Sequence, residues 1–340
     1  MTNPVLVEVT RGPRVESRHR GAIAIVDAGG RTLLVLGAVD APVFPRSAVK
    51  IFQALPLVES GAADAAGLTE AELALACSSH NGEAVHVDGA RAILAKAGAS
   101  EAALECGPQW PALGPDQDIL RRTGTPPCAV HNNCSGKHAG FVCTVAHMGH
   151  SVEGYVKEDH PLQVLIHDIL TEITGASLEA DVCGIDGCSI PTWAVPVENL
   201  AAAFAKVASG SGVSQERGAA LTRLRKACCA HPVEVAGTDR FCTDVMARFS
   251  DAAYVKTGAE GVYCAAIPAS GLGVAIKIDD GGTRGSEAVM AAVLQALVAR
   301  TDDDRGFLDR WANQPVETRR GYVAGTIRAS KDLTDALAAL

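Results

Sequence analysis

The stretch Gly21-Ala-Ile-Ala-Ile-Val26, the turn Asp27-Ala28-Gly29-Gly30 and the stretch Thr32-Leu-Leu-Val-Leu36 together carry the pattern of a β-hairpin. Two apolar runs flank a glycine-containing turn, which is typical of paired antiparallel strands. Val5 to Val9 is also apolar and predicts a strand. The last third of the chain has the same pattern of apolar runs separated by turns. It predicts strands over 253–256, 261–267 and 271–277, separated by Gly-rich turns, and then a helix over about 284–300.

The middle of the chain is mostly helical in pattern. Helices are predicted over 69–76, 85–98, 136–147, 161–174, 198–208 and 215–230. A further helix is expected from Ser47 to Ser60, ending at Gly61, with Pro56 kinking or splitting it. Strands at both ends with helices between them predict an α+β fold with one antiparallel sheet built from both ends of the chain and packed with helices. We expect a single domain over 1–340 with a mainly helical insert at about 60–230.

Composition excludes several classes of function. The 340 residues carry a net charge of −9 and no basic run, which argues against a nucleic-acid partner. No stretch approaches the roughly 20 apolar residues of a membrane span, and we expect no signal peptide at the N-terminus. The 11 cysteines are odd in number and scattered. We therefore expect reduced thiols and a cytoplasmic protein.

Three short segments carry candidate nucleophilic chemistry. They are Ser47-Ala48-Val49-Lys50, Ser79 in a small polar loop, and Lys256-Thr257-Gly258. On a helix, Ser47 and Lys50 share a face, and a neutral lysine amine can take the proton of a serine hydroxyl. The same three elements mark serine β-lactamases and penicillin-binding proteins, so the set predicts acyl transfer. Taken one at a time, the alternatives are a helix-capping serine, an ordinary turn and a lysine at a strand edge.

A second set of residues suggests a metal or an amino-acid ligand. Two thiolates and one nitrogen from Cys134, Lys137 and Cys188 would make a zinc site with one open position. The alternative is inert buried cysteines, because lysine must lose a proton before it binds a metal. Arg46 and Asp186 suit the carboxylate and ammonium of a zwitterion, although each could equally be a solvated surface charge.

With these segments in view, the chain resembles the class 3, rhizobial-type L-asparaginases. The most specific matches are the following two segments: His131-Asn-Asn-Cys-Ser-Gly-Lys-His138 and Lys256-Thr-Gly-Ala-Glu-Gly261. Further matches run through most of the chain: Val7-Glu-Val-Thr-Arg-Gly12, Val15-Glu-Ser-Arg-His19, Pro45-Arg-Ser-Ala-Val-Lys50, Ser79-His-Asn-Gly-Glu83, His160-Pro-Leu-Gln163, Asp186-Gly-Cys188, Val195-Pro196, His231-Pro232 and Val235-Ala-Gly-Thr238.

The resemblance implies a catalytic apparatus of two Ser–Lys tandems. Ser47 matches the first serine and Lys50 its lysine, while Ser79 matches the second serine and Lys256 its lysine. The zinc ligands of the family fall on Cys134, Lys137 and Cys188. We expect Arg46, His80 and Asp186 to bind the substrate, although the residue pattern around His80 alone favours a structural hydrogen bond.

The resemblance also implies a serine β-lactamase-like fold, a cytoplasmic homodimer and hydrolysis of L-asparagine to L-aspartate and ammonia. Two alternatives remain open at this point. One is a related serine amidohydrolase, either a glutaminase or a β-lactamase-like enzyme. The other is a non-enzymatic zinc-binding protein in which the serines are helix caps and the cysteines are structural.

Overall fold

The computed structural model describes residues 2–340 and divides them into two compact units. Unit 1 comprises the described residues up to Ala48, together with Val195–Ser209 and Val255–Leu340. Unit 2 comprises Val49–Ala194 and Gly210–Tyr254. The expectation of a single domain with a helical insert stays a prediction, since compactness alone does not show which part folds by itself.

An antiparallel sheet of eight strands dominates unit 1, with the order β11-β12-β1-β2-β10-β9-β8 and with β3 beside β2. Its strands are β1 (Val5–Arg11), β2 (Arg14–Val26), β3 (Thr32–Leu36), β8 (Tyr254–Thr257), β9 (Val262–Ile267), β10 (Leu272–Ile278), β11 (Asn313–Glu317) and β12 (Val323–Ala329). Apart from Tyr254, all of these residues lie in unit 1. The predicted sheet of N-terminal and C-terminal strands is therefore confirmed.

The predicted hairpin over residues 21–36 forms as β2 and β3, with Ala24 opposite Val35. The Asp27 side chain closes the turn by accepting the Gly29 N–H at 2.9 Å, and Gly30 takes a positive φ of 82°. Every residue of β2 from Gly21 to Val26 is buried, which explains why this stretch is apolar without alternation.

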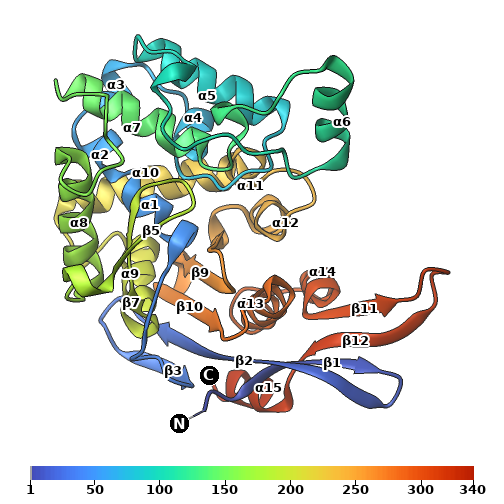
Figure 1. Cartoon of the computed structure of the whole chain (residues 1–340). Coiled ribbons are helices and arrows are strands. Elements are labelled where there is room, and N and C mark those ends of the chain that lie inside the picture. The colour runs from blue at the N-terminus through green and yellow to red at the C-terminus, as the bar shows by residue number, and fades with distance from the viewer. Residues whose placement is uncertain (1) are drawn as a thin grey trace. The chain divides into compact units, whose positions relative to one another are not determined.

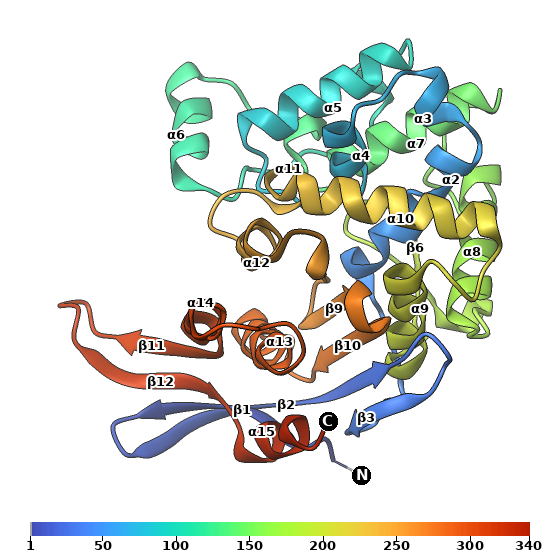
Figure 2. The ribbon, with the colours of Figure 1, turned by 180° about the vertical axis from the view of Figure 1, so that it is seen from behind.

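Two helices bury the central strands of this sheet. Helix α9 (Val197–Ser209) packs on β2, β9 and β10. A β-carbon on Gly273 of β10 would lie 2.0 Å from the Ala201 carbonyl oxygen, so glycine allows this close approach. Helix α13 (Thr283–Leu297) contacts β9 and β10 and also β1 and β12, and the curled sheet encloses it (Figures 1 and 2).

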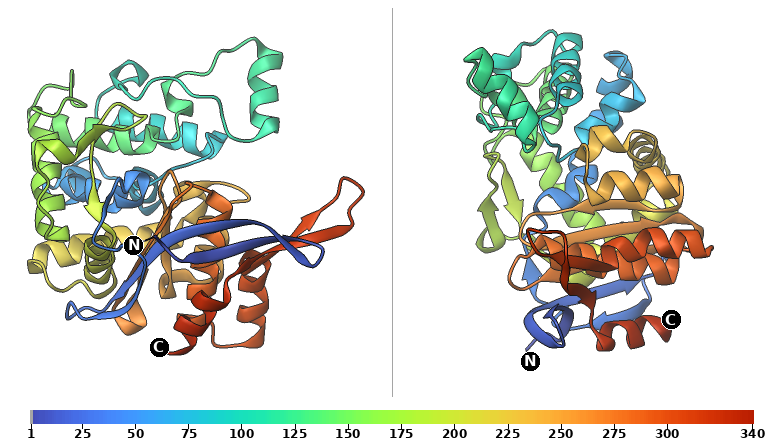
Figure 3. Two further views of the ribbon diagram at one scale, coloured as in Figure 1. Left: turned by 60° about the horizontal axis from the view of Figure 1, so that its bottom comes forward. Right: turned by 90° about the vertical axis from the view of Figure 1, so that its right-hand side faces the viewer.

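The hairpins β1–β2 and β11–β12 lie side by side and extend away from the rest of unit 1 (Figure 3). The residue pattern did not predict β11, because Asn313-Gln-Pro-Val-Glu317 contains proline and few strand-forming residues. Its position at the edge of the sheet explains the sequence, since an edge strand tolerates a proline that cannot donate a hydrogen bond. Helices α14 (Asp302–Ala312) and α15 (Lys331–Ala338) complete the C-terminal part.

Unit 2 is mainly helical, as predicted for the middle of the chain. Its longer helices are α4 (Glu70–Ala76), α5 (Ala84–Lys96), α6 (Gly114–Thr123), α7 (Ser135–His147), α8 (Pro161–Thr174), α10 (Gln215–Ala230) and α12 (Phe241–Phe249). Helix α7 contacts α4 and α5, and α4 also contacts α10. Among residues 2–340, no helix has both the length and the hydrophobicity needed to span a membrane.

The helix predicted from Ser47 to Ser60 is not continuous. It forms as a 3-10 turn over Arg46–Val49, then α1 (Lys50–Gln53) and α2 (Leu55–Glu59). The break at Ala54 places Pro56 in the first turn of α2, where its missing N–H has no helical partner to lose. The expected split at the proline is confirmed, but the tight first turn was not predicted.

Candidate functional site

Lys50 is the centre of the predicted site residues in unit 2. Its side chain is only 1% exposed at the start of α1. Its Nζ atom contacts the Ser78 carbonyl oxygen, lies 2.9 Å from Ser79 Oγ and lies 3.0 Å from Cys134 Sγ. An ammonium would donate to all three groups, whereas a neutral amine would donate to two and accept the Ser79 hydroxyl proton. The contact therefore suits proton exchange between Lys50 and Ser79.

The loop that carries Ser79 is tied to distant parts of the chain. The Ser79 N–H donates to the Val235 carbonyl at 2.9 Å, and the His80 N–H donates to the Asn133 carbonyl at 3.2 Å. His80 Nδ1 accepts the Gly82 N–H, so its Nε2–H is the atom that donates to Ser135 Oγ at 3.0 Å. These bonds give His80 a structural role, and its predicted contact with substrate stays a prediction.

Cys134, Lys137 and Cys188, to which the family resemblance assigns zinc, lie beside one another in the structure. Cys134 precedes α7 and Lys137 lies in the first turn of that helix, so the two side chains share one side of it. Lys137 Nζ lies 3.0 Å from Cys188 Sγ, and the Cys188 thiol forms a hydrogen bond with Cys134. All three side chains are buried.

The charges in this cluster compensate one another. A hydrogen bond from Cys188, together with the positive charges of Lys50 and Lys137, outweighs burial and holds the pKa of Cys134 well below its usual range. The same bond and burial raise the pKa of Cys188, so this sulfur keeps its proton. Burial lowers the pKa of Lys137, but the nearby sulfurs of Cys188 and Cys134 outweigh it and raise the pKa overall. A Cys134 thiolate thus accompanies the buried Lys137 ammonium.

Asp186 shapes the turn that presents Cys188. This turn joins β5 (Cys183–Ile185) and β6 (Pro191–Trp193). The Asp186 carboxylate accepts the Cys188 N–H at 3.3 Å, and the Asp186 N–H donates to the Ile190 carbonyl at 2.9 Å. Asp186 therefore fixes the backbone from which the Cys188 thiol reaches Lys137.

The donor set of Cys134, Lys137 and Cys188 fits a zinc ion. Lys137 Nζ and the Cys134 sulfur each lie within hydrogen-bonding distance of Cys188 Sγ, and two sulfurs with one nitrogen are a chemically suitable set for zinc. Across residues 2–340, no three His, Cys, Asp or Glu side chains are grouped to hold a metal. A metal at this cluster would therefore depend on the amine of Lys137 as its third ligand.

Ser47 and Lys256 lie in unit 1. Arg46 has a positive φ of 52° and immediately precedes Ser47 in the 3-10 turn. Lys256 is fully buried in β8, and its Nζ donates to the Thr257 carbonyl at 3.1 Å. A β-carbon on Gly258 would lie 2.4 Å from the Pro45 carbonyl oxygen. Unit 1 therefore brings the Lys256–Gly258 segment beside the Pro45–Ser47 segment, although more than 200 residues separate them in sequence.

Sequence reasoning missed the residues that hold the Ser79 loop. These are Asn81, Glu83, Ser135, Thr238 and Arg240. Two of the matched segments, Ser79–Glu83 and Val235–Thr238, contain three of them. Nothing in a single sequence shows that Glu83 and Thr238, 155 residues apart, are hydrogen-bonded.

Comparison with solved structures and with curated proteins gives no informative match. Two similar solved structures are described as Mglu in its tris and glutamate form and as Mglu in its native form in the presence of 4.3 M NaCl. They are 14% and 15% identical to this chain, cover 84% and 83% of it, and each has a TM-score of 0.35. The chain spans 61% of the length of these structures, and a likeness this weak supports no inference about fold or function. No similar sequence was found among curated proteins.

The model of the family described as L-asparaginase II matches residues 7–329. That range includes every predicted catalytic, ligand and substrate-binding residue, from Arg46 to Lys256. The match covers nearly the whole chain and confirms the resemblance seen in the sequence. The chain therefore belongs to the L-asparaginase II family.

Proposed function

We propose that this chain is an amidohydrolase that converts L-asparagine to L-aspartate and ammonia. Membership of the L-asparaginase II family supports this class of reaction. The observation that carries the proposal is the buried Lys50 amine, which is in hydrogen-bond contact with the Ser79 hydroxyl at 2.9 Å. A lysine so placed suits proton transfer in acyl chemistry.

In this proposal Ser47 attacks the side-chain amide carbon of asparagine, and Lys50 accepts the proton of its hydroxyl. Ser79 and Lys256 pass protons toward the nitrogen that leaves as ammonia. Backbone N–H groups at the start of the Ser47 turn stabilise the oxyanion. Water then hydrolyses the acyl-enzyme by the reverse proton transfers. The contact between Lys50 and Ser79 supports the proposed proton transfer from Ser47 through Lys50 to Ser79.

The substrate is a small zwitterion in this proposal. Arg46 would pair with its carboxylate and Asp186 with its ammonium, and His80 would also contact the substrate. The family resemblance also supports a serine β-lactamase-like architecture and a homodimer, both of which stay predictions. Sedimentation of the purified chain checks the second of these.

We also propose that Cys134, Lys137 and Cys188 hold zinc. When bound there, the ion supplies an open coordination position that can hold a polar group of the substrate. The nucleophile comes from serine, so activity need not depend strictly on the metal. Binding would require the Cys188 thiol and the Lys137 ammonium to lose their protons, whereas the lowered pKa of Cys134 already favours its thiolate.

The test is ammonia release by the purified chain from asparagine and from glutamine, with and without a chelator and across a range of pH. We expect release from asparagine in preference to glutamine and a rate that rises toward alkaline pH, because a lysine base must be neutral. Faster release from glutamine would overturn the substrate. A flat pH profile would contradict a lysine base, and no release from either amide would overturn the enzymatic function.

A further inference from the structure

Two segments of unit 2 are joined by a dense set of hydrogen bonds. One contains Ser79 and ends in the first turn of α5, and the other runs from α11 (Pro232–Ala236) to Arg240. The bonds between them, with donor first, are Ser79 N to Val235 O, His86 Nε2 to Val233 O, Asn81 Nδ2 to Thr238 O, Arg240 to Asn81 Oδ1, and Thr238 N and Oγ1 to Glu83. The second segment therefore supports the Ser79 loop along its length.

Glu83 and Thr238 form the centre of this connection. Glu83 Oε1 accepts the Thr238 N–H at 2.8 Å, and Oε2 accepts the Thr238 hydroxyl at 2.7 Å. Asn81 Nδ2 donates to the same Oε1 at 3.1 Å. Burial alone would raise the pKa of Glu83, but these donors outweigh it and lower the pKa, which favours the carboxylate that accepts all three bonds.

The backbone of the second segment is adapted to this contact. Gly237 has a φ of 102°, and a β-carbon there would lie 2.4 Å from Glu83 Oε1 and 2.6 Å from Asn81 Nδ2. Thr243 Oγ1 donates to the Gly237 carbonyl at 2.6 Å and holds the turn from the other side. The loop thus brings its backbone against the carboxylate in a way that a side chain at position 237 would prevent.

We propose that Glu83 and Thr238 are positioning residues for Ser79. The Glu83 carboxylate fixes the second segment against the Ser79 loop, and the Val235 carbonyl of that segment fixes the Ser79 N–H. The Ser79 hydroxyl is thereby held 2.9 Å from Lys50 Nζ. The inference rests on the proposed function for its kinetic consequences, while the geometry of Ser79 tests it separately.

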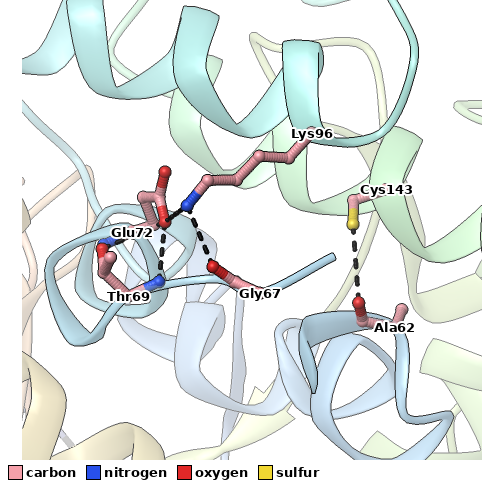
Figure 4. Close-up of polar contacts among 6 residues, drawn as sticks. All are labelled: Ala62, Gly67, Thr69, Glu72, Lys96 and Cys143. Atoms are coloured by element: carbon pink, nitrogen blue, oxygen red, sulfur yellow. Dashed lines mark hydrogen bonds and ion pairs between the residues drawn. The ribbon is translucent and has the colours of Figure 1, made fainter. Parts of the chain in front are cut away.

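The experiment compares Thr238→Val with Thr238→Ser, and both with Thr69→Val as a matched control. Thr69 is also an exposed threonine of unit 2, and its hydroxyl donates to the Glu72 carboxylate at 3.0 Å (Figure 4). It is the N-cap residue of α4, at the opposite end of that helix from the Ser79 loop, and Lys96 also pairs with Glu72 at 2.6 Å. The control removes the same kind of hydroxyl-to-carboxylate bond, together with the N-cap bond from the Glu72 N–H at 3.3 Å, and Thr69 makes none of the bonds that join the two segments around Ser79.

Misplacement of a reacting group by about 1 Å can reduce turnover about 100-fold. We expect kcat for asparagine to fall by about 10- to 100-fold in Thr238→Val with little change in KM, and to recover in Thr238→Ser. Thr69→Val should stay within about twofold of the wild type. If Thr238→Val keeps the kcat of the wild type, the positioning role is wrong. The role is also wrong if Thr69→Val and Thr238→Val lose equal thermal stability and their kcat falls by the same factor.

A second pair of variants and a structural readout complete the experiment. If Thr238→Val fails to fold, Glu83→Gln and Glu83→Ala replace it. Glu83→Gln retains an acceptor for the Thr238 N–H, so it should lower kcat less than Glu83→Ala. Crystal structures of Thr238→Val and Thr69→Val give a readout that needs no turnover. We expect the Ser79–Lys50 contact to be lost only in the first, and an intact contact there would overturn the inference even if asparagine is not the substrate.

Discussion

The two serines predicted from the sequence are held in different ways. Ser79 sits in a loop whose N–H groups and side chains bond to Val235, Asn133 and Ser135, all far away in sequence. Ser47 follows Arg46, whose positive φ of 52° sets the direction of a tight 3-10 turn. Ser79 depends on many remote hydrogen bonds, whereas Ser47 depends on the local backbone.

This difference predicts different sensitivities. Single side-chain changes at remote positions should disturb Ser79, because each removes one of several bonds that fix the loop. Ser47 should instead respond to changes in backbone preference at its own turn. The following changes test each half of the comparison.

Two substitutions at Arg46 distinguish the effect of its backbone conformation from the effect of its side chain. Arg46→Gly and Arg46→Ala both remove the guanidinium, so both should raise KM for asparagine by about 10-fold or more if Arg46 makes the charged hydrogen bond to the substrate carboxylate that we propose. Only glycine accepts the positive φ freely, so we expect Arg46→Ala to be less stable to denaturant than Arg46→Gly by about 1 kcal/mol. An unchanged KM in both would remove Arg46 from substrate binding, and equal stabilities would show that the turn is not strained.

His86 bonds to both segments that hold Ser79, so the pH dependence of its contribution to stability tests how this support is built. Its Nδ1 accepts the Glu83 N–H at 3.0 Å and its Nε2–H donates to the Val233 carbonyl at 2.8 Å, so it is neutral in the fold. Burial lowers the pKa of His86 below its ordinary 6.5, against the opposing charges of Glu83, Glu234 and Asp116. His86 therefore binds a proton more readily in the unfolded chain than in the folded one. The stability that His86 contributes is therefore complete above about pH 6.5 and is lost as the pH falls.

The check is denaturant unfolding of the wild type and of His86→Asn, which retains an acceptor for the Glu83 N–H but does not titrate. We expect the wild type to be more stable by about 1 kcal/mol near neutral pH, with a difference that shrinks in acid. A difference that stays constant with pH would contradict a neutral, buried His86.

Much of the fold followed from local patterns. The strands over residues 21–36 and 261–278 are apolar runs between glycine turns, and the predicted helices show clear periodicity. The strand β11 could not be predicted, because a polar, proline-containing segment becomes a strand only through pairing with β12. The 3-10 turn at Arg46 was equally hidden, since arginine has no preference for a positive φ.

The sequence and the family resemblance name candidate site residues, and these roles stay predictions, but they do not give the contacts among them. The family resemblance named Cys134, Lys137 and Cys188, and the structure brings them together. Lys50 was assigned to Ser47 by its spacing along the chain, whereas the structure shows its amine in contact with Ser79 and Cys134. Contacts of this kind depend on how separate segments pack, and spacing in one sequence cannot show them.

The most direct measurement compares ammonia release from asparagine by Ser47→Ala and by Ser79→Ala, each confirmed to be folded. With Ser47 as the nucleophile, Ser47→Ala should reduce turnover by at least about a thousandfold. It should also trap no acyl-enzyme on rapid quenching and mass spectrometry, whereas Ser79→Ala should still form that intermediate slowly. Near-normal turnover in Ser47→Ala, together with loss of all turnover in Ser79→Ala, would show that the attacking serine is Ser79.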